Sequence, residues 1–416
     1  MKYYFLFLVL SLSIVYGSSC TPDIQWSKTF NESTWSEVHS LQQTSDGGYI
    51  VVCLSSNDNS WIKKLDNKGD IAWDKNFSNG KYTNLESIVQ TTDGDFILAG
   101  YVNFKGFGAE TDALLARVDS NGNTKWVKTY GGPGTEGVNS VAVTPDGGYI
   151  FAGWTFSQKN NYDYWVVKTD VNGNMQWNKS FGGSTGEEAY SIRPTSDGGY
   201  IIAGPVNSIG AGSDDAWLIK LDSNGNEQWN KTYGKSSQDG AYSVWQTSDL
   251  GYIITGITDS YNGLGGNWNA WLIKTDSLGN TQWNKIIETN SASIAHSVQQ
   301  APDGGYLVVG ESYSSFGQFK RKGYAWIVKT NSEGIIEWTK NLTNSYNGAA
   351  YAFQQTSDGG YVVAGFSGPI NELNRNAWIT KINPCDNFCA APFSLLIILL
   401  FSLIFISSNP VYINQE

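Results

Sequence analysis

The stretch "IQWSKTF" (Ile24–Phe30) decides the fold, because it is the closing part of a repeat that has no beginning before it. Related phrases return as "MQWNKSF" (Met175–Phe181), "EQWNKTY" (Glu227–Tyr233) and "IEWTKNL" (Ile336–Leu342), and each of these closes a longer repeat. The first copy must therefore complete a repeat that lies elsewhere in the chain.

Three sequence elements each occur seven times. A turn resembling "DGGY" begins at Asp46, Asp93, Asp146, Asp197, Asp249, Asp303 and Asp358. A run resembling "WLIKLD" begins at Trp61, Leu114, Trp165, Trp217, Trp271, Trp326 and Trp378. A run resembling "QWNKTY" has its tryptophan at Trp26, Trp73, Trp126, Trp177, Trp229, Trp283 and Trp338. Self-similarity of this length indicates a repeat architecture.

Each repeat predicts four short strands, which we name A to D. Strand A resembles "AYSIRP", strand B "GYIIAG", strand C "AWLIKLD" and strand D "EQWNKTY". The runs are rich in Ile, Val, Tyr and Trp and are separated by Gly, Asn and Asp, which is typical of all-β repeat folds. "TSDGGY" predicts a tight hairpin between A and B, and "DSNGN" predicts one between C and D.

The spacings predict how the repeats assemble. The C-strand aromatic position precedes the D-strand Trp by 12 residues in six repeats, and every D-strand Trp, including Trp26, precedes the next turn Asp by 20. The seventh repeat ends at "AWITKIN" (Ala377–Asn383) without a strand D, which Ile24–Phe30 can supply. Since an unpaired edge strand promotes aggregation, we expect a seven-bladed β-propeller with four-stranded blades, closed by its N-terminal strand on the last blade.

The repeat "TSDGGYIIAG…DAWLIKLDSNGNEQWNKTYG" resembles the β-propeller repeats of secreted and cell-surface proteins of prokaryotes and some protists, over roughly residues 24 to 384. The resemblance implies a fold and a location outside the cell, but no particular activity. "DSNGNEQW" (Asp222–Trp229) is also similar to the tryptophan-docking motif of quinoprotein-like propellers. It departs from that motif in its Asp-to-Gly spacing and in lacking Ala before Asp. The similarity implies docking of Trp between blades, and no quinone cofactor.

Both ends of the chain are apolar. Residues 1–17 contain Lys2 and then an apolar run, which predicts a secretory signal peptide, with a buried first helix as the alternative. Residues 392–408 lie in "AAPFSLLIILLFSLIFISS", which predicts a single-pass transmembrane helix. A lipid-anchor signal is the alternative, although it would have a polar spacer before the apolar run and no polar tail after it. The expected parts are a signal peptide (1–17), the propeller (18–384), a linker (385–391), the membrane segment (392–408) and a polar tail (409–416).

These features predict an exported, membrane-anchored protein of the cell surface. The net charge of −11 repels phosphate backbones and argues against a nucleic-acid partner. Five sequons are compatible with export, at Asn31, Asn76, Asn178, Asn230 and Asn341.

Four cysteines are too few, and wrongly spaced, for a disulfide scaffold or a zinc site. Closure of the propeller brings the chain near Cys20 together with the chain near Cys385 and Cys389. We therefore expect Cys20 to form a disulfide with one of these two, and Cys53 of strand B to be a buried thiol.

Basic residues recur once in every strand C and once in every strand D, so they cannot form a single patch. We expect them to contact the turn aspartates and the Asp that ends strand C. Those strand-ending residues are Asp66, Asp119, Asp170, Asp222 and Asp276. The "DSNGN" turns lack the alternating acidic ligands and the closing Glu of a calcium loop, so we expect plain hairpins. Neither a metal nor a cofactor is expected.

Aromatic residues outside the strand C and strand D positions are candidates for binding. Trp35, Trp154 and Trp268 are expected in the D–A or B–C connections of one face, where they could stack on sugars or pack a loop. Trp245 of strand A is expected in the core. The B–C connections Thr258–Asn269 and Ser312–Tyr324 are the strongest candidates for a glycan or anionic partner. Their candidate ligand-binding residues are Tyr261, Trp268, Phe316, Phe319, Lys320, Arg321 and Lys322.

One strand A position could form a ring around the axis of the propeller. Its residues are His39, Glu86, Asn139, Tyr190, Tyr242, His296 and Tyr351. The ring could hold a ligand or serve only a structural role.

Catalysis has no clear signature in the sequence. A glycosidase needs two carboxylates that face a cleft, for which Asp112, Asp163, Asp214 and Asp215 are the candidates. However, the position two places before the strand C aromatic residue is Asp in some repeats and Asn in others. This exchange indicates a side chain that stabilises a turn. We therefore expect a non-enzymatic surface propeller that binds a glycan or a protein through its B–C loop face. A carbohydrate-active enzyme and a structural coat protein are the alternatives.

Overall fold

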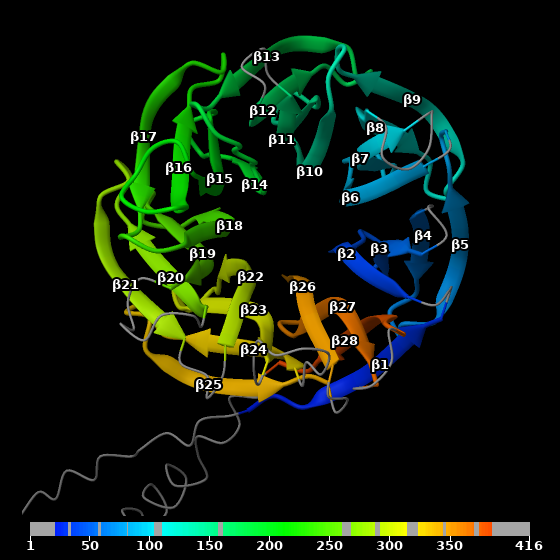
Figure 1. Ribbon diagram of the computed structural model, residues 1–416. Coiled ribbons are helices and arrows are strands. Elements are labelled where there is room, and N and C mark those ends of the chain that lie inside the picture. The colour runs from blue at the N-terminus through cyan, green and yellow to red at the C-terminus, as the bar shows by residue number, and fades with distance from the viewer. Residues whose placement is uncertain are drawn as a thin grey trace, which may run out of the picture. The chain divides into compact units, whose positions relative to one another are not determined.

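The structure, a computed structural model, describes most of the region predicted to form the propeller. The described residues are 21–31, 35–56, 60–80, 82–103, 110–156, 161–259, 268–287, 292–313, 323–343, 347–369 and 374–384. Within them, 28 strands form seven four-stranded antiparallel sheets, which are arranged as blades around an axis (Figure 1). The all-β, seven-bladed propeller predicted from the repeats is confirmed.

Strand A is the innermost strand of each blade, and strand B follows it outward (Figure 1). The A strands are β2 (Ser36–Gln43), β6 (Tyr82–Gln90), β10 (Glu136–Val143), β14 (Ser191–Pro194), β18 (Asp239–Gln246), β22 (Ala292–Gln300) and β26 (Asn347–Gln355). The B strands are β3 (Tyr49–Ser55), β7 (Phe96–Asn103), β11 (Tyr149–Phe156), β15 (Tyr200–Val206), β19 (Tyr252–Thr258), β23 (Tyr306–Tyr313) and β27 (Tyr361–Gly368).

Strands C and D complete each blade toward the rim. The C strands are β4 (Ser60–Leu65), β8 (Asp112–Val118), β12 (Tyr162–Thr169), β16 (Asp215–Leu221), β20 (Asn269–Thr275), β24 (Gly323–Thr330) and β28 (Asn376–Ile382). The D strands are β5 (Ile71–Phe77), β9 (Thr124–Tyr130), β13 (Met175–Phe181), β17 (Glu227–Tyr233), β21 (Thr281–Ile287), β25 (Ile336–Asn341) and β1 (Ile24–Phe30). We number the blades 1 to 7 from β2, so that β1 belongs to blade 7.

The N-terminal strand closes the propeller as predicted. β1 pairs antiparallel with β28, from Ile24 opposite Ile382 to Phe30 opposite Ala377. In Figure 1 the blue β1 runs along the rim beside the orange last blade. Side chains reinforce the pairing, since Trp378 Nε1 donates to Ser27 Oγ at 2.8 Å. The missing strand D of the seventh repeat is therefore the first strand of the chain.

The apolar core is divided among the junctions between blades. The D-strand Trp of each blade packs against the aromatic residue that begins strand B of the next blade, as Trp177 does with Tyr200 at a ring-centroid distance of 6.0 Å. The other pairs are Trp26–Tyr49, Trp73–Phe96, Trp126–Tyr149, Trp229–Tyr252, Trp283–Tyr306 and Trp338–Tyr361. The docking of Trp between blades that the motif implied is confirmed by these contacts.

The basic residues of strand C meet the turn aspartates of their own blade, as expected. The ion pairs are Lys64–Asp46, Arg117–Asp93, Lys168–Asp146, Lys220–Asp197, Lys274–Asp249, Lys329–Asp303 and Lys381–Asp358. The expectation for strand D was wrong in part. Lys28 and Lys75 bind the residue that ends the next blade's C–D turn, Asp70 and Asn123 respectively. The Asp that ends strand C instead accepts hydrogen bonds within its own turn, as Asp222 does from the N–H groups of Asn224 and Asn226.

Several predictions concern residues outside the described ranges. They include the signal peptide, the segment 392–408, and the three cysteines Cys20, Cys385 and Cys389. Among the described residues, no helix is long and apolar enough to cross a membrane. Cys53 is a buried thiol in β3. All five sequon asparagines are exposed, and their glycosylation stays a prediction.

Candidate functional site

Six of the seven predicted axial residues occupy β-bulges, and the seventh, Tyr190, lies just before β14. In blade 1, Val38 pairs with Cys53 and Ser40 pairs with Val52, so His39 between them is left without a partner in the ladder. The same shift leaves out Glu86, Asn139, Tyr242, His296 and Tyr351 in their blades. A bulge re-aims the side chain of the extra residue. In this propeller it lets one side chain per blade meet its neighbours around the axis.

Contacts link these side chains from blade to blade. His296 packs on Tyr351 at 4.9 Å and stacks with Tyr242 at 5.8 Å, measured between ring centroids. Tyr242 in turn packs on Tyr190 at 5.4 Å. On the other side of Tyr351, His39 donates from Nδ1 to Glu86. His39 also packs on Tyr351 at 5.9 Å, so six of the seven predicted residues form a continuous series of contacts, while Asn139 donates to Glu188. Whether this ring holds a ligand stays a prediction.

The imidazole of His39 lies between two carboxylates within this ring. Burial opposes protonation, but the carboxylates of Glu86 and Glu37 more than offset it and raise the pKa of His39 well above its usual value. Nε2 of the ring donates to Glu37 Oε1 at 3.2 Å, and the guanidinium of Arg375 also reaches Glu37 at 3.5 Å. This arrangement fixes His39 as part of an ion-pair network.

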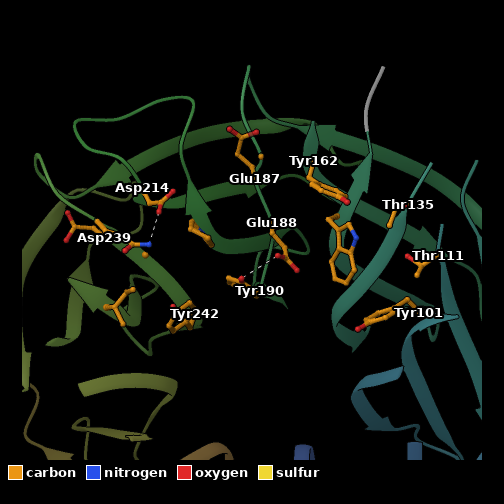
Figure 2. A pocket seen from close by; sticks show the side chains of 16 residues that line it. Tyr101, Thr111, Thr135, Tyr162, Glu187, Glu188, Tyr190, Asp214, Asp239 and Tyr242 are labelled. Atoms are coloured by element: carbon orange, nitrogen blue, oxygen red, sulfur yellow. Dashed lines mark hydrogen bonds between the residues drawn. The ribbon is translucent and has the colours of Figure 1, made fainter. Parts of the chain in front are cut away.

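A cavity of about 600 Å³ lies on the face formed by the B–C and D–A connections of blades 2 to 5. Figure 2 shows its lining, with Asp214 and Asp239 on one side, Tyr162 and Tyr101 on the other, and Glu188 and Tyr190 between them. β14 explains the position of the central residues. This strand begins only at Ser191, so Glu187 and Glu188 lie in an irregular segment at the cavity and not in a ladder.

Aromatic rings make up much of the lining. Trp154 belongs to β11 and not to a connection, which corrects its predicted place, and its indole packs on Tyr101 at 5.4 Å. Tyr162 begins β12 and is 41% exposed. Tyr190 and Tyr242 extend the lining to the axial ring. The cavity therefore offers exposed ring faces next to polar groups, which is the composition of many small-molecule sites.

Carboxylates supply the charge of the cavity. Asp214 accepts hydrogen bonds from the side-chain amides of Gln238 at 2.9 Å and Asn207 at 3.0 Å. Glu188 accepts from Asn139 Nδ2 at 2.9 Å and from the hydroxyl of Tyr190 at 3.4 Å. Burial raises the pKa of Glu188 above its usual range. No Lys or Arg is among the described residues that line the cavity.

Three pairs of acidic residues lie at consecutive blade junctions beneath this face. We call Asp112–Glu136, Asp163–Glu187 and Asp215–Asp239 the inter-blade acid pairs. In each pair the first residue is near the start of strand C and the second is near the start of the next blade's strand A. A side-chain carbon added to the glycine between them, Gly131, Gly182 or Gly234, would contact both carboxylates of the pair.

The acid pairs change the interpretation of the Asp found two places before the strand C aromatic position, which the sequence indicated to be a turn residue. Asp215 Oδ2 accepts from the N–H groups of Ala211 at 2.6 Å and Gly212 at 3.0 Å, as expected of a turn residue. Its Oδ1 has no hydrogen-bond partner and lies beside Gly234, as does Oδ2 of Asp239. Burial, followed by the charges of Asp239 and Asp214, raises the pKa of Asp215. The sequence did contain a signal for the pairs, since their members are 24 residues apart in all three cases. Of the four carboxylates proposed for glycosidase chemistry, only Asp214 lines the cavity.

The remaining predicted binding residues are dispersed. Trp268 packs against a small apolar cluster that includes Ile257 and Tyr313, and Trp35 forms an isolated bridge with Arg375. Trp245 lies in β18 as expected and packs, half-buried, against the core cluster that contains Val298 and Tyr306, under the guanidinium of Arg193 at 5.1 Å. Tyr261, Phe316, Phe319, Lys320, Arg321 and Lys322 lie outside the described residues. In the part of the chain that is described, no three His, Cys, Asp or Glu residues are grouped to hold a metal ion.

Comparison with known proteins gives no family. No family model and no curated protein matches the sequence. Similar solved structures include YCF48 from Cyanidioschyzon merolae, at 10% identity and a TM-score of 0.47, over 86% of this chain and 98% of that one. A protein of unknown function from Bacteroides caccae is 10% identical with a TM-score of 0.43, over 74% of this chain and 94% of that one. Sqt1 from Chaetomium thermophilum is 12% identical with a TM-score of 0.43, over 86% of this chain and 100% of that one. Function is therefore inferred from the site.

Proposed function

We propose that this propeller is a non-enzymatic binding protein and that the cavity over blades 2 to 5 binds a glycan. The observation that carries the proposal is the combination of exposed ring faces with carboxylates in one cavity. Sugars stack their C–H faces on aromatic rings, and their hydroxyls donate to carboxylate oxygens. Trp154 and Tyr162 supply the first kind of contact, and Asp214 and Glu188 supply the second.

The proposed setting is the outside of the cell. It rests on the expected signal peptide, the apolar segment 392–408 and the five exposed sequon asparagines. At a cell surface, a rigid disc with one loop-bearing face suits recognition of external polysaccharide.

The test is a glycan array probed with the soluble propeller, followed by calorimetry on the best ligand. Tyr162→Ala is expected to weaken binding about fivefold, because loss of one stacking ring costs about 1 kcal/mol. Leu278→Ala is the matched control, since this side chain is exposed on the opposite face. Wild-type affinity in the Tyr162 variant contradicts the proposed location.

The expected B–C loops offer an alternative location for the site. Shortening both Thr258–Asn269 and Ser312–Tyr324 to the length of Leu54–Ser60 changes no repeat spacing, so the fold is expected to persist. If the ligand occupies the cavity, this variant binds it with unchanged affinity. Loss of binding only in this variant assigns the ligand to the loops.

A glycoside hydrolase is the second candidate, favoured by one observation. Burial raises the pKa of Glu188, as in a general acid, and Asp214 shares its cavity. Release of reducing ends from a bound polysaccharide, abolished by Glu188→Gln and by Asp214→Asn, would establish hydrolysis. Binding without release supports the non-enzymatic reading of the site.

A further inference from the structure

We propose that the glycan bound in the cavity carries free, protonated amino groups, as in a polymer of glucosamine. This inference rests on the proposed function and names the class of glycan. It follows from the charge of the cavity, from the acid pairs behind it, and from the rings beside both.

The first observation is the set of donors that reach the lining carboxylates. Glu187 Oε1 accepts from the backbone N–H of Ser208 at 3.1 Å and from the hydroxyl of Thr185 at 3.0 Å. Glu188 and Asp214 accept only from amides and a phenol among the described residues. These neutral donors hold the carboxylates in place but leave their negative charge uncompensated. The contrast with the seven turn aspartates is clear, since each of those binds Lys or Arg.

The second observation is Asp215, which is 1% exposed and follows the lining residue Asp214 in the chain. Its Oδ1 atom has no hydrogen-bond partner and lies beside Gly234, as does Oδ2 of Asp239, which lines the cavity. Two like charges held close together in a buried site repel each other and raise the free energy of the folded state. A cation in the adjoining cavity would lower this cost further, beside the hydrogen bond that Asp239 accepts from the backbone N–H of Lys235 at 2.9 Å.

The third observation is the distribution of the acid pairs around the propeller. They occupy the junctions between blades 2 and 3, 3 and 4, and 4 and 5, which are the blades that form the cavity. At the equivalent strand A position, the other junctions have Ser36, Thr83, Ser293 and Gly348. Ser36 and Ser293 each accept a hydrogen bond at 3.0 Å from strand C of the preceding blade, from Ala377 N and Ala270 N respectively. A neutral residue can therefore make the contact at this junction, and the acidic residues are confined to the junctions of the blades that form the cavity.

The chemistry of an amino sugar fits all three observations. Its ammonium group can donate to Glu188 or Asp214 and approach the ring faces of Tyr190 and Tyr242 for a cation–π contact. Its pyranose face can stack on Trp154 or Tyr162. The negative potential of the acid pairs also attracts the ammonium group, whereas it does not attract a neutral sugar.

The experiment compares three β-1,4-linked hexamers by calorimetry on the intact propeller: glucosamine, N-acetylglucosamine and glucose. The glucosamine hexamer is expected to bind about tenfold more tightly than the others, a preference that salt reduces. Glu188→Gln and Asp214→Asn are each expected to weaken binding of the glucosamine hexamer more than binding of the acetylated hexamer, and so to remove most of this preference. Glu333→Gln, on a C–D turn of the opposite face, is the control for net charge and is expected to keep the preference.

The outcomes separate this inference from the function on which it rests. Equal binding of the three hexamers overturns the amino-sugar assignment and leaves the glycan-binding function standing. Failure of every glycan on the array overturns the proposed function as well. Binding of hexalysine as tight as that of the glucosamine hexamer, lost in the same two variants, overturns the glycan class in favour of a cationic peptide.

Discussion

Lys168 shows, at the scale of one residue, how the chain holds a charge inside a blade. Its ammonium group donates to Asp146 at 2.7 Å, to the carbonyl of Thr169 at 2.9 Å and to Gln176 at 3.0 Å, which satisfies all three N–H groups. Although burial opposes ionisation of Asp146, hydrogen bonds from Lys168 and Thr144 lower its pKa to about 2. The same carboxylate also accepts from Gly148 N, so one Asp ties a turn to a strand.

Leu250 is a residue-scale departure from the repeat that can be tested directly. Six A–B turns have glycine in its place, whereas Leu250 adopts a φ of 66° and is 55% exposed. A left-handed conformation costs a branched residue roughly 1–2 kcal/mol, part of which glycine gives back as entropy of the unfolded chain. We expect Leu250→Gly to raise the free energy of unfolding by about 0.5–1 kcal/mol, measured by urea denaturation.

Leu278 is the matched control for that substitution. It is an exposed leucine in the C–D turn of the same blade, and its φ is not positive. Leu278→Gly is expected to lower stability slightly. A gain of equal size in both variants would show that left-handed strain at Leu250 is not the cause.

Asp215 gives a residue-scale prediction with a pH dependence. Its folded pKa lies above the ordinary value of 3.8, so ionisation opposes folding. The cost is absent below pH 3.8, grows as the pH rises through the folded pKa, and persists at neutral pH. Asp215→Asn keeps an oxygen for Ala211 and Gly212 and can donate to Asp239. We expect it to raise stability at neutral pH by on the order of 1 kcal/mol and to have little effect at low pH.

The same substitution at Asp146 should act in the opposite direction. Its pKa is lowered to about 2, so its ionised form contributes stability above pH 3.8 that is lost as the pH falls through about 2. Asp146→Asn is therefore expected to lower the melting temperature at neutral pH, because buried Lys168 loses its carboxylate. Parallel changes in the two variants would contradict the assignment of the inter-blade acid pairs.

At the scale of elements, the docking of strand D on the next blade's hairpin holds adjacent blades together. Gly225 at the tip of the β16–β17 hairpin has a φ of 79°, and a side-chain carbon there would lie 2.8 Å from Trp177 Cζ3. Gly198, in the β14–β15 turn, has a φ of 82° and open space around it. The two glycines therefore share backbone strain and differ only in contact with Trp.

This difference predicts unequal costs for the same change. Gly198→Ala is expected to lower the free energy of unfolding by about 1 kcal/mol, because alanine is unfavourable in the left-handed conformation. Gly225→Ala is expected to cost at least about 1 kcal/mol more, since Trp177 must move out of its packed position. Urea denaturation of both variants, with Trp fluorescence as the probe, measures the difference. Equal losses would mean that Trp docking contributes little at this junction.

Elements that obey the repeat could be predicted from the sequence, and those that depart from it could not. The strands and the hairpins follow from constant spacings, and the pairing of Lys168 with Asp146 follows from residue types that recur in every repeat. The shift of strand pairing at His39 leaves no mark in composition, because a bulge adds no unusual residue type. The late start of β14 was missed for a similar reason, since "EEAYSIRP" fits the strand A pattern throughout. Because this irregular segment supplies Glu187 and Glu188, the cavity itself could not be predicted.

At the scale of the whole molecule, the closure of blade 7 joins the ends of the described chain. Asn383 N donates to the carbonyl of Asp23 at 2.9 Å, and Thr380 Oγ1 donates to that of Trp26 at 2.9 Å. Trp26 also docks on Tyr49 of blade 1, so β1 belongs to blade 7 by pairing and supports blade 1 by packing. One seven-residue strand therefore completes two junctions at once.

Removal of β1 is accordingly expected to destabilise the propeller as a unit. A chain that starts at Trp35 leaves β28 as an open edge and Tyr49 without its Trp partner, so we expect a lower melting temperature and aggregation. A chain that starts at Thr21 keeps β1 and is the control. Adding a synthetic peptide of residues 21–31 should raise the melting temperature of the shorter chain in proportion to the logarithm of peptide concentration, because the peptide binds the folded form alone. An unchanged melting temperature in the shorter chain would show that the other six blades hold the ring closed without this strand.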